Sequence, residues 1–121
     1  MKYRFAHHRL DAYRLASELA DHVNELAPQI PLGGGGKKEL RPQIVDAANS
    51  CPALIAEGAN RWTSKQKRQR FIEARGEAGE VASHLERCHR RSFISEQQLE
   101  RGLELADRVC ATLTGLIKRH S

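Results

Sequence analysis

Apolar residues recur at steps of three and four along most of the chain, which is the spacing of one face of an α-helix. Proline, glycine and short polar stretches separate four such segments, and they predict helices at about residues 8–27, 39–60, 64–91 and 95–119. The positions expected to face the core in the first two helices are Leu15, Leu19, Val23, Leu26, Leu40, Ile44, Ala47, Cys51 and Ile55. We expect one domain over residues 1–121, since domains of this length are common.

The third and fourth segments keep a heptad spacing, which is typical of helices that pack side by side. Their expected core positions are Phe71, Ala74, Ala78, Val81, Leu85 and Cys88, and then Leu99, Leu103, Ala106, Cys110, Leu113 and Ile117. Thr63 or Ser64 is expected to cap the third helix, and Ser95 with Gln98 forms a capping box for the fourth. A short connection requires these two helices to be antiparallel. The pattern predicts an all-α, up-down-up-down antiparallel four-helix bundle.

Proline and glycine mark the interruptions. Residues 28–38 form a glycine-rich linker after the first helix, and they lack the Lys-Ser or Lys-Thr pair and the preceding strand of a P-loop. Pro52 lies inside the second helix and is expected to kink it. In the third helix, Gly76 and Gly79 with Ala78 and Ala82 form a small-residue surface. The second helix or a neighbouring subunit can approach such a surface closely.

Composition agrees with a helical protein, because aromatic residues are only 5% of the chain and charged residues are 29%. No segment reaches the roughly 20 apolar residues of a membrane-spanning helix, so no membrane partner is expected. The first ten residues lack the apolar core of a secretory signal, which predicts a cytoplasmic protein. Three widely spaced cysteines fit reduced thiols better than a disulfide framework.

Residues with catalytic or metal-binding chemistry do not form a recognisable constellation. His84 and Cys88 share a helix face, but no second ligand pair accompanies them, so no metal site and no cofactor are expected. No nucleophile has a recognisable base, and we expect a protein that is not an enzyme. Glu57, beside Leu54 and Ile55, is interpreted as a structural acid paired with an arginine or, alternatively, as a catalytic acid.

The net charge of +5 comes from 20 Lys and Arg against 15 Asp and Glu. Between Arg61 and Arg91 there are nine basic residues and four acidic ones, so this segment carries the whole excess. Of the basic residues, 14 are arginine, which reflects either phosphate contacts or a GC-rich genome. A basic balance favours an acidic partner.

A basic stripe is predicted on the third helix, away from its apolar seam. At 100° per residue its members fall within about 80° of arc, and they are Arg61, Lys65, Arg68 and Arg75. Such a stripe either contacts successive phosphates, with sequence-tolerant and salt-dependent binding, or is a solvated face. Trp62, at the start of the stripe, either stacks on an unpaired base or packs against a loop.

Four sequence blocks occur in a specific order between residues 40 and 86: LRPQIVDAA, SCPALIAEGANR, TSKQ and RFIEARGEAGEVASHLE. This order and spacing resemble the four-helix-bundle family of proteins encoded in intervening sequences of bacterial ribosomal RNA genes. Weaker similarity extends to LIKRH near the end of the chain. The residues that match the family motif are Gln43, Ala47, Ala48, Ser50, Pro52, Ile55, Ala56, Glu57, Gly58, Arg70, Phe71, Ala74 and Gly76.

The resemblance implies a cytosolic bacterial protein without catalytic activity that assembles as a ring-like homopentamer. The family is similar to the accessory protein of diversity-generating retroelements, a basic pentameric barrel that partners a reverse transcriptase and contacts nucleic acid. This chain departs from the family pattern at Val45 and Asp46, where the family has two basic residues, and at Leu54, where it has Asn. The loop after the first helix is also longer and richer in glycine. A nucleic-acid surface must therefore come from the third helix.

These observations predict a non-enzymatic, oligomeric bundle that binds RNA or DNA backbone without base specificity. The expected binding residues are Arg61, Trp62, Lys65, Arg68 and Arg75. The protein is then an accessory to a reverse transcriptase or another nucleic-acid enzyme. The alternative is a structural or protein-interaction scaffold whose basic surface meets acidic side chains of a partner.

Overall fold

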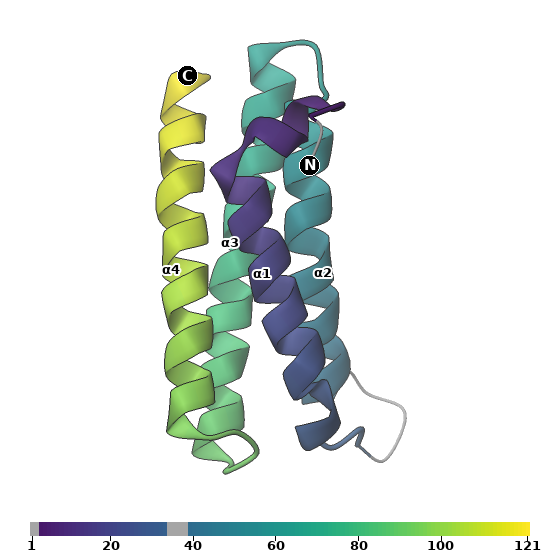
Figure 1. Ribbon diagram of the computed structural model, residues 1–121, viewed down its shortest axis with the longest axis vertical. Coiled ribbons are helices and arrows are strands. Elements are labelled where there is room, and N and C mark those ends of the chain that lie inside the picture. The colour runs from purple at the N-terminus through teal and green to yellow at the C-terminus, as the bar shows by residue number, and fades with distance from the viewer. Residues whose placement is uncertain (1–2, 34–38) are drawn as a thin grey trace.

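The predicted apolar segments form four long helices in the computed structural model, which describes residues 3–33 and 39–121. The helices are α1 (Asp11–Leu26), α2 (Leu40–Ala59), α3 (Ser64–Arg90) and α4 (Glu96–Arg119), with short 3-10 turns η1 (Ala6–Arg9) and η2 (Ala27–Gln29). They run alternately up and down, and α1 and α3 each pack against both α2 and α4 (Figure 1). The described residues contain no strand. The predicted antiparallel four-helix bundle is confirmed.

The core follows the predicted stripes in α1 and α3 and differs from prediction in α4. Every predicted core position of α1 and α3 is buried. In α4 the buried residues are Gly102, Leu105, Ala106, Val109, Leu113 and Leu116, whereas Leu99, Leu103, Cys110 and Ile117 are only half-buried. The reason is that α4 carries apolar residues over a wide arc, and Gly102 lets that helix turn its other edge towards Leu85 and His22. In α2, Leu40 is half-buried, while the other predicted positions are buried.

Side-chain caps fix where α3 and α4 begin, as predicted. Thr63 Oγ1 accepts from the Gln66 backbone N–H at 3.1 Å, and Ser95 Oγ accepts from the Gln98 backbone N–H at 3.1 Å. Helix α3 ends where Ser92 takes a left-handed conformation with φ of 63°. The backbone N–H groups of Ser92 and Phe93 then bond back to His89 and Cys88, both at 2.9 Å. This Schellman motif turns the chain towards α4.

One predicted boundary and the predicted linker differ in detail. Helix α1 begins at Asp11, later than predicted, because Ala6–Arg9 form the 3-10 turn η1. Helix α2 continues through Pro52, as its predicted range requires, and the kink at Pro52 stays a prediction. One residue of the predicted linker packs into the core, since Ile30 is fully buried and its carbonyl accepts from Arg41 Nε at 2.7 Å. The rest of that linker, residues 34–38, lies outside the described residues.

Two glycines show opposite packing environments. A Cβ atom on Gly58 would lie 2.8 Å from Phe71 Cε1, so this glycine permits the close approach of α2 and α3. A Cβ on Gly76 would meet nothing within 4 Å, and the same holds for Gly79. Ala78, in contrast, lies in the core. The second helix therefore does not cover Gly76 and Gly79, and contact with a neighbouring subunit stays a prediction.

These environments predict opposite effects of the same substitution. Gly58→Ala should lower the free energy of unfolding by about 1–2 kcal/mol, because overpacking against the buried Phe71 ring outweighs the gain in helix propensity. Gly76→Ala should raise it by about 1 kcal/mol, because an exposed helix interior gains only propensity. Urea denaturation of both variants measures the difference. Changes of the same sign in both variants would contradict the described packing of Gly58.

Among the described residues, no helix is long and apolar enough to cross a membrane.

Candidate nucleic-acid interface

The bundle topology brings distant parts of the sequence to one end. Helices α1 and α3 begin there, and α2 and α4 end there (Figure 1). Asn60 Nδ2 lies 2.9 Å from His7 Nδ1, and Ser64 Oγ lies 3.3 Å from His120 Nδ1. We call this region, made of residues 3–11, 57–68 and 118–121, the basic end.

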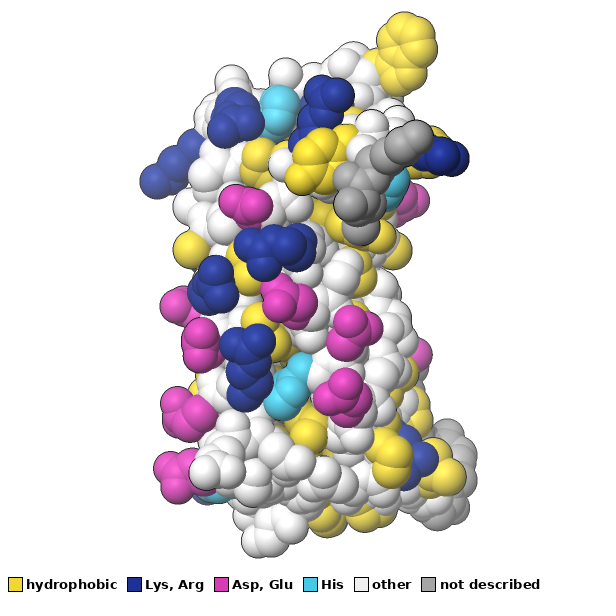
Figure 2. All heavy atoms as spheres, in the orientation of Figure 1, with side chains coloured by type: hydrophobic (Ala, Val, Ile, Leu, Met, Phe, Trp, Pro, Cys, Tyr) yellow, Lys and Arg dark blue, Asp and Glu magenta, His cyan; other side chains and the backbone are white. Residues whose placement is uncertain are grey.

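The basic end contains eight Lys and Arg residues and only two carboxylates. The basic residues are Arg4, Arg9, Arg61, Lys65, Lys67, Arg68, Lys118 and Arg119, and the acidic ones are Asp11 and Glu57. On the face shown in Figure 2, basic side chains gather towards this end, and acidic side chains dominate the lower part. Basic residues near the start of the chain and at the end of α4 thus add to the positive charge at the start of α3.

Sequence reasoning missed the contribution of the chain's two ends to this surface. Arg9 and Arg119 line one open hollow of about 300 Å³ between the start of α1 and the end of α4. They are far apart in sequence, so counting charge along one helix does not pair them. The signal that could have found them is the predicted up-down topology, which places both ends of the chain beside the start of the third helix.

Three of the predicted binding residues are accessible to a ligand. Arg61, Lys65 and Arg68 are all exposed. None of the ion pairs within the described part of the chain involves them. Arg61 lies in the turn before α3 and not on the helix itself. Their charges are therefore not neutralised by neighbouring carboxylates.

Two other basic residues of α3 form hydrogen bonds within the bundle. Arg75 Nε donates to Thr114 Oγ1 at 3.0 Å, which directs this exposed side chain towards α4. Lys67 Nζ donates to the Ala59 carbonyl at 2.8 Å and caps α2. The predicted stripe therefore does not continue evenly from Arg61 to Arg75. The uncompensated charge concentrates at the first turn of α3.

A hollow at this turn gathers cationic and amide groups. It has a volume of about 310 Å³ and is lined by Arg61, Lys65, Gln66, Gln69 and Arg70. Arg70 Nη1 donates to both carboxylate oxygens of Glu73, at 2.9 and 3.0 Å, and its buried Nε has no hydrogen-bond partner. Three positive side chains thus line the hollow, and one of them, Arg70, is paired with a carboxylate. This arrangement suits an anion with several acceptor oxygens.

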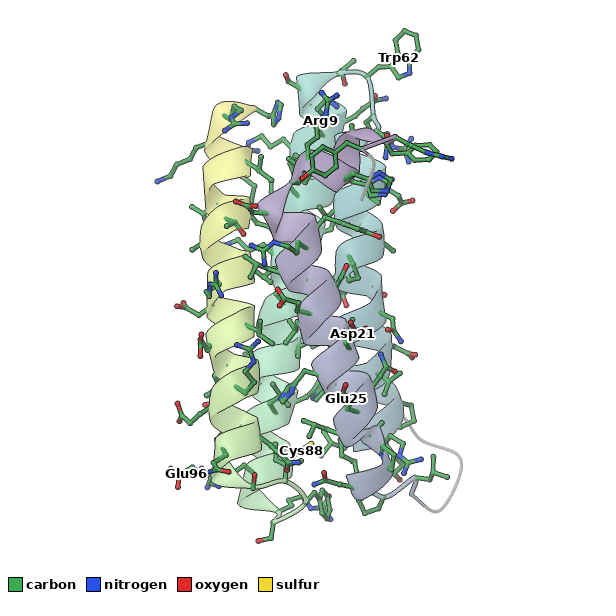
Figure 3. The ribbon with its side chains drawn as sticks, viewed as in Figure 1. Arg9, Asp21, Glu25, Trp62, Cys88 and Glu96 are labelled. Carbon is green, nitrogen blue, oxygen red and sulfur yellow. The ribbon has the colours of Figure 1, made fainter. Side chains whose placement is uncertain are left out.

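Trp62 follows Arg61 in the α2–α3 turn and is 96% exposed. Figure 3 shows its side chain projecting away from the bundle. The alternative in which Trp62 packs against a loop is therefore wrong. Phe5 and Tyr3, also at the basic end, are 59% and 64% exposed. Exposed aromatic faces beside cations are the elements that bind unpaired bases and phosphates together.

The three thiols are shifted towards their protonated forms. Burial raises the pKa of the Cys51 thiol to about 12 and also raises the pKa values of Cys88 and Cys110. Protonated thiols are poor nucleophiles and poor metal ligands. Among residues 3–33 and 39–121, no three His, Cys, Asp or Glu side chains group as metal ligands. Glu57 is exposed and takes part in none of the ion pairs found in these ranges.

The residues of the sequence motif mainly build the contact between α2 and α3. Ala47, Ala48, Ile55, Gly58, Phe71 and Ala74 are buried, Gln43, Pro52, Ala56 and Arg70 are half-buried, and Ser50, Glu57 and Gly76 are exposed. Cys51 Sγ donates to the Ala74 carbonyl at 3.4 Å across this contact. The motif therefore positions the α2–α3 turn, on which Arg61 and Trp62 lie.

Comparisons with known proteins agree with this architecture. A solved structure of a protein of unknown function from the S23 ribosomal protein family of Bacteroides thetaiotaomicron has a TM-score of 0.79. It shares 20% sequence identity and covers 88% of this chain and 98% of its own, so it shows the same fold. No curated protein matches the sequence significantly. The family model described as 23S rRNA-intervening sequence protein matches residues 8–115. The chain therefore belongs to the 23S rRNA-intervening sequence protein family.

Proposed function

We propose that this protein is a non-enzymatic module that binds the backbone of RNA or DNA at its basic end, without reading base sequence. The observation that carries the proposal is the hollow lined by Arg61, Lys65 and Arg70, together with the almost fully exposed Trp62 that follows Arg61 in the chain. The cations supply contacts to phosphate oxygens, and the indole supplies a stacking face. The family name, which refers to 23S rRNA, supports a nucleic-acid partner.

The geometry favours single strands over duplexes. Trp62 can stack only on a base that is not already stacked within a helix, and stacking contributes about 1–3 kcal/mol per base. Lys65 and Arg68, one turn apart on α3, contact neighbouring phosphates of the same strand. Each phosphate contact releases condensed counterions, so binding weakens as salt concentration rises.

We also propose that assembly of several copies into a ring increases the affinity for nucleic acid. A ring of five copies, as the family resemblance implies, carries about +25 from the +5 of each chain. Linked sites then act together on one strand, and weak individual contacts give a higher overall affinity. Gly76 and Gly79, exposed on α3 with no atom near their Cβ positions, leave room for a neighbouring subunit. In this role the ring accompanies a nucleic-acid enzyme, such as a reverse transcriptase.

The rival function is a scaffold whose basic end meets acidic side chains of a partner protein. Binding to single-stranded RNA, duplex DNA and polyglutamate, measured side by side over a range of salt, separates the two functions. We expect single-stranded RNA to bind best, because polyglutamate offers carboxylates without bases. Polyglutamate binding as tight as RNA binding would instead support the scaffold. Light scattering on the same samples measures the number of copies.

A further inference from the structure

A second hollow lies between the start of α2 and the last turns of α3, away from the basic end. Its volume is about 320 Å³, and it is lined by Leu40, Gln43, Ser83, His84, Arg87 and Arg91. Figure 3 labels Cys88, which lies on α3 at this level of the bundle. From Lys65 to Arg87, α3 rises about 33 Å at 1.5 Å per residue. The hollow is therefore a separate place on the molecule.

Two arginines supply positive charge to this hollow. Arg87 and Arg91 are one helical turn apart and both exposed, and neither takes part in an ion pair within the described residues. Arg91 Cζ lies 5.1 Å from the centre of the Phe93 ring, a cation–π contact that holds the guanidinium in place. A held guanidinium loses less freedom when it binds an anion. The pair is thus arranged for a ligand with several acceptor oxygens.

His84 adds a polar atom that lacks a hydrogen-bond partner. Its side chain is only 17% exposed, and its buried Nε2 has no hydrogen-bond partner. Glu80 Oε1 lies 3.7 Å from Nε2, which is within ion-pair distance but beyond hydrogen-bond distance. A buried polar group without a partner is costly, and an acceptor oxygen in the hollow would remove that cost.

The start of α2 reinforces the positive potential. Glu39 occupies the N-cap position, but no side chain caps the helix. The Glu39 side chain is placed against Gly33 and does not line the hollow. The positive end of the helix dipole therefore acts on the same region as the arginines.

We propose that this hollow binds a phosphate monoester, through Arg87, Arg91 and His84. A monoester carries about −1.5 to −2 charge at neutral pH and offers three acceptor oxygens, which match three donor side chains. Its source is either the terminal phosphate of a nucleic-acid strand or a small phosphorylated compound. The site is independent of the basic end, and its failure would leave the proposed function intact.

Titration with inorganic phosphate, followed by side-chain NMR signals of His84 and Arg87, tests the site at constant ionic strength with chloride as reference. We expect saturable shifts in the natural protein. The double variant R87Q/R91Q should weaken phosphate binding at least tenfold, as is typical when both charged hydrogen-bond donors are lost. The control R90Q removes an exposed arginine from the same turn that does not line the hollow, and it should bind phosphate normally. The K65E/R68E variant should also bind phosphate normally, because its changes lie at the basic end.

Equal losses in R90Q and R87Q/R91Q, or equal shifts with chloride, would overturn the proposal, provided that circular dichroism shows all variants folded. Two further ligands identify the source of the phosphate. A 5′-phosphorylated oligonucleotide that shifts His84 more than its 5′-hydroxyl form supports the end of a strand. Inorganic phosphate binding without any such preference supports a small phosphorylated compound.

Discussion

Reversal of Lys65 and Arg68 to Glu is expected to weaken binding to single-stranded RNA by 10- to 100-fold, on the order expected for two lost phosphate contacts. Both side chains are exposed, and neither has a carboxylate partner in the described part of the chain. The reversal therefore removes attraction and adds repulsion without breaking an internal ion pair. The slope of log affinity against log salt should also become shallower, by about 0.7 for each lost contact with a single strand. Fluorescence anisotropy at several salt concentrations measures both quantities.

The matched control is R90E/R108E. It changes the net charge by the same amount at two exposed arginines that lie outside the basic end and have no ion pair among the described residues. If binding depends on the basic end, the control should lose only the small part of the affinity that arises from long-range attraction. Equal losses in the two variants would show that net charge, and not this surface, determines binding.

Trp62→Ala should lower the affinity for single-stranded RNA by about 1–3 kcal/mol, or about 5- to 150-fold. The stability of the fold should stay unchanged, because the side chain is 96% exposed and little packing is lost. Affinity for duplex DNA should change little, since paired bases offer no free face for stacking. Isothermal titration with both nucleic acids, together with a thermal melt, measures these three outcomes.

Trp62→Phe is the companion variant, because it keeps an aromatic face of smaller area and should retain most of the binding. An equal loss for single strands and duplexes in Trp62→Ala would contradict stacking and indicate a general contact. A lower melting temperature would indicate that the indole packs within the fold after all.

The sequence is sufficient to predict the bundle because its patterns agree at several levels. The caps at Thr63 and Ser95 mark the starts of α3 and α4, the apolar seam of α3 marks its core face, and the short turn at Ser92 requires the two helices to be antiparallel. The sequence pattern did not indicate which edge of α4 faces the core. That helix has apolar residues on two adjacent edges, and only the fit of Gly102 against Leu85 selects between them.

Sequence reasoning predicted only those residues of the candidate site that lie close together in the chain. Arg61, Lys65 and Arg68 are close in sequence, so helical geometry was enough to group them. The exposure of Trp62 depends on the course of the α2–α3 turn, which periodicity does not describe. The contact of Arg75 with Thr114 and the pairing of Arg9 with Arg119 across one hollow both depend on how α4 lies against its neighbours. Such contacts between distant segments are set by packing, and one helix pattern cannot indicate them.

The first described residues and the C-terminal turn of α4 both lie at the basic end (Figure 1). An affinity tag attached at either place would therefore affect measurements of ligand binding. A polyhistidine or fluorescent group attached near Tyr3 or Ser121 would lie at the basic end, where it would compete with a ligand or screen its approach. For assays of the basic end, a dye is better placed at the far end of the bundle, outside the hollow lined by Arg87 and Arg91.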